Sequence, residues 1–244
     1  MQLKGVRVLI TGAGRRVGKV LALTLAQSGA RLVVHYHRSR HEAQMLRKQI
    51  LAQGGEVVLV QGDLSKEASL QLLAQKAWQA FGGLDVLINN ASNFYPTPLG
   101  KTKFSEWDDL FAVNARAPYF LSQSLGLKMK KRGRGKIINI ADWAALRPYT
   151  GYIPYCAAKA ALVGLSQGLA KSLAPEVQVN TVLPGPVMWP ADLGSKVKKE
   201  VLAKTPLKCI GRPEDIANTV KFLIEGTDYM TGALVHVDGG RSIL

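Results

Sequence analysis

The chain has 244 residues, of which 47% are hydrophobic and 20% are charged. This composition is that of a folded globular protein and excludes an intrinsically disordered one. No apolar run approaches the roughly 18 residues of a membrane span. The formal net charge of +15 admits nucleic acid or an anionic membrane as a partner, and equally an anionic cofactor or a solvated surface.

The densest basic cluster lies within residues 128–136, at the end of a helical pattern, where positive charge meets the helix dipole favourably. No recognised nucleic-acid-binding module accompanies it, so we expect neither nucleic acid nor a membrane as partner. Cys156 and Cys209 form no disulfide framework, and free thiols in a cytoplasmic protein are the simplest interpretation. The amino terminus enters a strand-like run directly, so we expect no signal peptide.

Predicted strands and helices alternate along the whole chain. Strands are expected at residues 6–10, 32–36, 57–61, 84–89, 136–141, 178–182 and 233–237, and helices at 17–25, 44–51, 70–81, 107–131, 152–173 and 213–225. The strands are continuous apolar runs, which is typical of a parallel sheet buried on both faces. Strict alternation implies right-handed crossovers, and we predict a doubly wound α/β fold in one domain, residues 1–244.

A glycine-rich turn follows the first predicted strand, with the sequence Thr11-Gly12-Ala13-Gly14-Arg15-Arg16-Val17-Gly18. Glycines between a strand and a helix let the backbone approach a pyrophosphate at the helix amino terminus. Arg16 stands where a glycine is common in this pattern. On the glycines alone, an ordinary tight turn is about as good an interpretation as a dinucleotide site.

The end of the second predicted strand distinguishes two dinucleotides. An acidic residue there would bind the ribose 2′-hydroxyl of NAD, but the chain has His35-Tyr36-His37-Arg38-Ser39. A cation and a hydroxyl at this place suit the 2′-phosphate of NADPH through charge-assisted hydrogen bonds. A solvated basic loop is the alternative, and the location at the carboxyl end of a strand favours NADPH.

Two further loops fall at the same predicted edge of the sheet. Asp63 and Leu64 follow the third strand and would lie near the adenine, while residues 89–92 follow the fourth strand. Ligands bind at this edge in doubly wound sheets.

Tyr155 and Lys159 are four residues apart in a predicted helix, so their side chains lie on one face, one turn apart. A nearby ammonium stabilises a phenolate and lowers the pKa of a tyrosine, which would make Tyr155 an acid/base near neutral pH. Taken alone, the spacing favours a packed tyrosine beside a solvated lysine, because such pairs arise by chance in many helices.

Together these motifs resemble the short-chain dehydrogenase/reductase family over essentially the whole chain. The matching features are the turn at residues 11–18, Asp63, Asn89-Asn90-Ala91, Asn114, Tyr155-x-x-x-Lys159, Pro184-Gly185 and Asp238-Gly239-Gly240. The resemblance implies a Rossmann fold with a seven-stranded parallel sheet, helices on both faces, and a homotetramer. It also implies that Tyr155 is the acid/base, that Lys159 binds the nicotinamide ribose and that Asn114 holds a proton-relay water.

Three departures from the family pattern resemble its pteridine reductase branch. Asp142 stands thirteen residues before Tyr155, where a serine is usual, Ser92 follows Ala91 in place of a glycine, and Arg16 replaces a motif glycine. With residues 35–39 and 92–98, this resemblance implies NADPH-dependent reduction of a pterin, with dihydrofolate as a further candidate substrate. It implies that Phe94 stacks the pterin, that Ser92 and Arg16 contact pterin and phosphates, and that Asp142 donates a proton with Tyr155.

The expected site residues follow from the motifs and the resemblance together. The catalytic set is Asp142, Tyr155, Lys159 and Asn114. The NADPH contacts are Gly12, Arg15, Arg16, Val17, His35, Tyr36, His37, Arg38, Ser39, Asp63, Leu64, Asn90, Ala91, Ser92, Tyr155, Lys159, Pro184, Gly185 and Val187. The substrate contacts are Arg16, Ser92, Phe94, Asp142, Tyr155 and Trp189, and no metal site is expected. Residues 188–195 lie where enzymes of this family carry a mobile substrate lid, and two interpretations of Trp189 stay open: closing on the ligand or only packing.

The expected pairing of Asp142 with Tyr155 leaves more than one function open. A carboxylate beside Tyr155 would raise the tyrosine pKa and oppose Lys159, whereas a protonated Asp142 would form a proton-donating pair that suits reduction of a C=N bond. One alternative is an NADPH-dependent reductase of another carbonyl, such as a 3-oxoacyl thioester, although a ketone's developing oxyanion prefers a neutral hydroxyl donor. The other is a non-catalytic nucleotide- or nucleic-acid-binding protein on the same fold.

Overall fold

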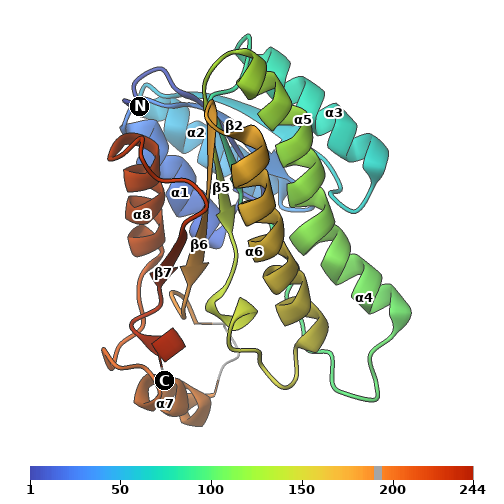
Figure 1. Ribbon diagram of the computed structural model, residues 1–244. Helices are drawn as coiled ribbons and strands as arrows, with labels where there is room; N and C mark the ends of the chain where they lie inside the picture. Colours follow the sequence, from blue (N-terminus) through green and yellow to red (C-terminus); the bar gives the residue numbers. More distant parts are fainter. Residues whose placement is uncertain (190–193, 244) are drawn as a thin grey trace.

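Seven parallel strands form one sheet in the order β3-β2-β1-β4-β5-β6-β7 (Figure 1). This computed structural model describes residues 1–189 and 194–243. The strands are β1 (Arg7–Ile10), β2 (Arg31–Tyr36), β3 (Glu56–Gln61), β4 (Val86–Asn89), β5 (Gly135–Ile140), β6 (Val177–Pro184) and β7 (Leu234–Val237). The predicted seven-stranded, doubly wound Rossmann fold is confirmed, and the expected strands are correct to within two residues at each end.

Helices cover both faces of the sheet (Figure 1). The α-helices are α1 (Arg16–Gln27), α2 (Arg40–Ala52), α3 (Glu67–Ala80), α4 (Phe104–Phe111), α5 (Ala117–Lys131), α6 (Ile153–Leu173), α7 (Ser195–Ala203) and α8 (Pro213–Glu225). One core cluster joins α1, α2 and α8 to the sheet, and a second joins α3, α5 and α6 to its other face. Successive strand residues alternate between these clusters, so Val8 and Ile10 lie in the first and Leu9 in the second.

Two regions differ from the sequence-based expectation. The predicted helix at 107–131 is three segments, α4, the π-helical turn η1 (Ala112–Arg116) and α5. The side-chain amide of Asn114 donates a hydrogen bond to the Leu110 carbonyl at 3.0 Å within this turn, and π turns of this kind concentrate at functional sites. The sequence also missed α7, which is short, polar on average and buries none of its residues.

Part of the basic cluster at residues 128–136 is used structurally, at the amino ends of the strands. Asp85 is buried and accepts hydrogen bonds from Arg7 Nε at 2.7 Å and Nη2 at 2.6 Å, while Arg132 lies 3.6 Å away. Burial acts to raise the pKa of Asp85, but the hydrogen bonds from Arg7 hold it below its usual value. Buried Lys136 pairs with Asp228 at 2.8 Å.

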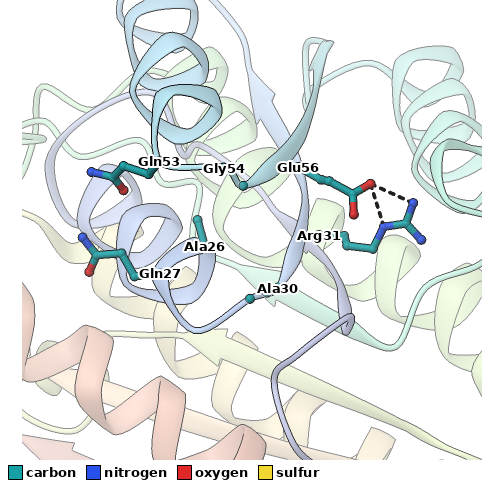
Figure 2. Close-up of a pocket in the computed structure, with 9 residues that line it drawn as sticks. Ala26, Gln27, Ala30, Arg31, Gln53, Gly54 and Glu56 are labelled. Carbon is teal, nitrogen blue, oxygen red and sulfur yellow. Dashed lines mark hydrogen bonds and ion pairs between the residues drawn. The ribbon is translucent and has the colours of Figure 1, made fainter.

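The same end of the sheet carries a shallow pocket between the segments that precede β2 and β3 (Figure 2). Arg31 and Glu56 line it and bond to each other at 2.9 and 3.0 Å. Ligands of doubly wound sheets bind at the opposite, carboxyl edge, so this pocket is not the candidate site. Within the described residues, no helix is long and apolar enough to cross a membrane.

We expect Asp85→Ala to lower the free energy of unfolding by about 3 kcal/mol, because it leaves the Arg7 guanidinium without its partner in a mostly buried position. Urea denaturation measures the change. Glu56→Ala is the matched control, since it breaks an exposed Arg–carboxylate pair and should cost less than about 1 kcal/mol. Equal losses in the two variants would show that burial does not strengthen the Arg7–Asp85 pair.

Candidate active site

The loops that carry the expected site residues all leave the carboxyl ends of strands. In a parallel sheet these ends share one edge, and the strand order reverses between β1 and β4, which is where ligands bind in doubly wound sheets. The turn after β1 and the loops after β2, β4 and β5 therefore lie at the same edge.

The glycine turn after β1 packs directly on the loop after β4. A Cβ on Gly12, whose φ is +64°, would lie 2.8 Å from Ala91 Cα, and one on Gly18 would lie 2.5 Å from the Gly12 oxygen. The Thr11 hydroxyl oxygen accepts hydrogen bonds from the backbone N–H groups of Asn90 and Ala91, each at 3.0 Å. Thr11 thus holds the loop after β4 in place. It was not among the expected site residues, although it is the first residue of the glycine-rich turn.

Arg16 adopts a backbone conformation that favours glycine. Its φ is +54°, in the left-handed region, which costs a residue with a side chain about 1 kcal/mol or more. Arg15 has an ordinary φ of −151° and caps the amino end of α1, whose first turn contains no acidic residue. Two exposed guanidinium groups at the positive end of a helix dipole make this end attractive to anions. Val17, also expected at the cofactor, packs against the core.

His35 supports the glycine turn through a hydrogen bond to Gly12. It is 1% exposed; its Nδ1 accepts a hydrogen bond from the Gly12 N–H at 3.2 Å, and its Nε2 donates to the Gly62 carbonyl at 3.1 Å. Burial lowers the pKa of His35 to about 4, so it is neutral. Tyr36 is buried too, so the side chains of both residues, which were expected at the cofactor, are enclosed by the protein.

Of the other residues expected to bind the cofactor from the loops after β2 and β3, some are exposed and one lies in the core. His37 and Arg38 are exposed, and Ser39 lies against Gly14. Asp63 accepts hydrogen bonds from the Ser65 N–H and hydroxyl; burial acts to raise its pKa, but these bonds hold the pKa of Asp63 below its usual value. Leu64 was also expected at the cofactor, but its side chain packs in the core.

Tyr155, Asp142 and Lys159 come together from α6 and the loop after β5. The Tyr155 hydroxyl donates to Asp142 Oδ2 at 2.6 Å, and Asp142 Oδ1 accepts from the Ala144 N–H at 2.8 Å. Lys159 Nζ donates to the Ile140 carbonyl at 2.9 Å and lies 5.9 Å from the centroid of the Tyr155 ring. Tyr155 and Lys159 are 4% and 2% exposed, so their interactions are little screened by water.

Burial, followed by the neighbouring Asp142, raises the pKa of Tyr155 well above its usual value. The lowering of this pKa expected from Lys159 does not set the net direction here, because desolvation and the carboxyl dominate. The expectation that a carboxylate raises it is confirmed. Burial also raises the pKa of Asp142 and lowers that of Lys159 to about 8. Both members of the Asp142–Tyr155 pair are thereby biased toward their protonated forms.

Asn114, Ser92 and Phe94 lie on the neighbouring wall. The Ser92 hydroxyl donates to Asn114 Oδ1 at 2.7 Å. Phe94 stacks on Tyr152 with ring centroids 4.5 Å apart and planes 2° apart, and meets Tyr155 edge-on at 4.7 Å. Half of Phe94 is exposed, so a flat apolar surface stands beside the Tyr155 ring; that it stacks a substrate stays a prediction.

The loop after β6 completes the edge. A Cβ on Gly185 would lie 2.6 Å from Asp238 Cα, which explains a glycine after Pro184, the last residue of β6. Val187 packs on the core and Trp189 is half-buried. Residues 190–193 of the expected lid lie outside the described residues. Among residues 1–189 and 194–243, no three His, Cys, Asp or Glu side chains are grouped to hold a metal ion.

Comparisons with known proteins agree with this geometry at the level of the family. Residues 12–242 match a family model described as enoyl-(acyl carrier protein) reductase. A 3-oxoacyl-[acyl-carrier-protein] reductase of Synechocystis sp. is 35% identical over 238 residues, 95% of each chain. A 3-oxoacyl-[acyl-carrier-protein] reductase of Staphylococcus epidermidis is 34% identical over 236 residues, 95% of this chain and 97% of the relative.

A solved structure of 7α-hydroxysteroid dehydrogenase, complexed with NADH and 7-oxo glycochenodeoxycholic acid, superposes with a TM-score of 0.93. It is 30% identical and covers 98% of this chain and 95% of its own. The names of the sequence relatives do not support the expected narrower resemblance to pteridine reductases, and the homotetramer stays a prediction. With a family match across residues 12–242 and relatives of this identity over 95% of its length, the chain belongs to the short-chain dehydrogenase/reductase family of nicotinamide-dependent oxidoreductases.

Proposed function

We propose that the protein reduces a pterin, with NADPH as the hydride donor and the Asp142–Tyr155 pair as the proton donor. The observation that carries this proposal is the 2.6 Å hydrogen bond between the Tyr155 hydroxyl and Asp142. Asp142 stands where the family usually has a serine. Reduction of a C=N bond needs a proton on nitrogen, and a buried carboxyl–phenol pair with raised pKa values supplies one.

The loops after β1 and β2 fit NADPH. The close approach of Gly12 to Ala91 leaves room only for a backbone without Cβ, and exposed cations stand at the amino end of α1. Arg38 is exposed at the end of β2, in the place that an NAD-selective carboxylate would take. When bound, NADPH supplies the hydride; the protein supplies orientation and the proton.

The protein's own groups can then move the proton in two steps. The Tyr155 hydroxyl, which donates to Asp142 in the structure, would turn to the substrate nitrogen and give it the phenolic proton. A protonated Asp142 would then donate its own proton to the phenolate oxygen and be left as a carboxylate. Lys159 lies close enough to the Tyr155 ring to stabilise the transient phenolate if its ammonium is charged. The exposed face of Phe94 offers a planar ring about 1 kcal/mol of stacking, beside Tyr155.

A 3-oxoacyl thioester is the second candidate substrate, and the names of the relatives that are 35% and 34% identical favour it. Asp142 speaks against it, because the oxyanion that develops on a ketone is stabilised better by a neutral hydroxyl than by a carboxyl group that can ionise. The two candidate substrates therefore differ in the group they require at residue 142: a carboxyl group for the pterin and a neutral hydroxyl for the thioester.

One assay separates them: NADPH oxidation with dihydrobiopterin, dihydrofolate and an acetoacetyl thioester side by side. We expect dihydrobiopterin to be reduced and the thioester to be left, with dihydrofolate showing how large a side chain the site accepts. Turnover of the thioester alone would overturn the proposal in favour of the second candidate.

Replacing Asp142 with Asn should lower kcat/KM for the pterin by about 100-fold or more, because the amide cannot reprotonate Tyr155. Steady-state kinetics measures the loss, and the fluorescence of bound NADPH should show unchanged cofactor affinity. Asp142→Ser is the matched variant, since it restores the hydroxyl usual in the family, and it should favour carbonyl substrates. Undiminished pterin turnover in Asp142→Asn would rule out the proton-donor role.

Arg38→Ala should weaken NADPH by about tenfold or more and leave NADH almost unchanged, because a charge-assisted hydrogen bond to the 2′-phosphate is lost. Titration of cofactor fluorescence gives both dissociation constants. Arg47→Ala removes an exposed cation further along α2 and serves as the control. Equal losses for NADPH and NADH would refute the assignment of Arg38 to the phosphate.

Arg16→Gly should raise the free energy of unfolding by up to about 1 kcal/mol, because glycine adopts a positive φ without strain. The same change should weaken NADPH, since an anion-binding cation is lost from the start of α1. Thermal denaturation and cofactor titration measure the two effects. Arg15→Gly, at an ordinary φ, should bring no gain in stability, and a gain there would point to a cause other than backbone strain.

A further inference from the structure

A short segment, Ser92–Tyr95, carries two of the proposed substrate contacts and is tied to α4 and η1. The Ser92 hydroxyl donates to Asn114 Oδ1, and the Asn114 amide donates to the Asn93 carbonyl at 2.9 Å. The amide also donates to the Leu110 carbonyl, so both of its hydrogens are used. Asn114 therefore acts here as a link between η1 and the segment.

Asp109, on α4, makes the other attachment. Its Oδ2 atom accepts hydrogen bonds from Asn93 Nδ2 and from the Tyr95 hydroxyl, each at 2.9 Å. The Tyr95 hydroxyl also lies 3.1 Å from the Glu106 carbonyl. Burial, followed by the bond to Asp109, raises the pKa of Tyr95 to about 12, which keeps its phenol a hydrogen-bond donor.

The two residues that Asp109 holds are the immediate neighbours of Phe94. While Asn93 and Tyr95 are fixed on α4, the Phe94 ring stacks on Tyr152 and meets Tyr155. An exposed aromatic side chain on a loop loses rotamer freedom when it orders, and fixing the backbone on both sides of it lowers that cost before a ligand arrives.

We propose that Asp109 is a positioning residue that holds Phe94 as a preformed platform for a flat ring beside Tyr155. This inference rests on the proposed function for its choice of substrate. Asp109 acts through Asn93 and Tyr95 and not by touching substrate, so its loss should affect flat-ring substrates far more than an open-chain thioester, which has no ring to stack.

The test compares Asp109→Ala with Asp109→Asn and Asp108→Ala. The amide oxygen of Asn can accept both hydrogen bonds, so Asp109→Asn should behave nearly as wild type, and Asp108→Ala removes an exposed carboxylate from the same helix. We expect Asp109→Ala to raise KM for dihydrobiopterin by about tenfold, the equivalent of one lost hydrogen bond. The kcat, the dissociation constant of NADPH and any residual thioester turnover should change less than threefold.

Amide hydrogen exchange of the peptide spanning residues 90–99 gives a second readout that needs no activity. Exchange should increase in Asp109→Ala and stay as in wild type in the other two variants. Unchanged exchange, or equal losses with dihydrobiopterin and thioester, would overturn the positioning role. Wild-type protein that reduces only the thioester would instead refute the proposed function, and the exchange comparison would still decide the role of Asp109.

Discussion

The all-parallel sheet, with its order reversed between β1 and β4, is the constraint on which the rest of the structure depends. It brings the carboxyl ends of β1, β2, β4 and β5 to one edge, so residues from separate loops meet there. The Thr11 hydroxyl bonds to the loop after β4, and His35 bonds to the turn after β1 and the loop after β3. Because these groups are buried, their hydrogen bonds fix the loops relative to one another.

The buried pair of Asp142 and Tyr155 distinguishes this site from the usual pattern of the family. A lysine one turn away would by itself favour the phenolate, but desolvation works against any charge and the adjacent carboxyl adds to that effect. The pair therefore retains protons in a site whose family pattern has a neutral serine. The raised pKa of Asp142 brings its carboxyl group nearer to neutral pH, where a general acid gives its proton most effectively.

The family comparisons and the site residues answer different questions. Identity of 33–35% across the chain shows the family, and members of one fold differ in their substrates. In the proposed function, substrate choice depends on a few side chains at the carboxyl edge, and Asp142 is one of them. The names of the relatives and the chemistry of Asp142 can thus point to different substrates within the same family.

The sequence by itself determined the alternation of strands and helices, the glycine turn, the basic end of β2 and the spacing of Tyr155 and Lys159. These features follow from local patterns, namely apolar runs, glycines at a turn and positions on one helix face. It also pointed to Asp142, because the residue stands at a fixed distance from Tyr155 along the chain.

Only the tertiary structure decided what surrounds those groups. It buried His35 and Leu64, widened the helix at Asn114 and joined Asp109 to Asn93 and Tyr95. It also decided the direction of the Tyr155 pKa shift, for which Lys159 and Asp142 gave opposite expectations. Desolvation and hydrogen bonding depend on atoms that come from different segments of the chain. Asp109, for example, is 14 residues from Tyr95 and 16 residues from Asn93 in the sequence. No local pattern of residues encodes that environment.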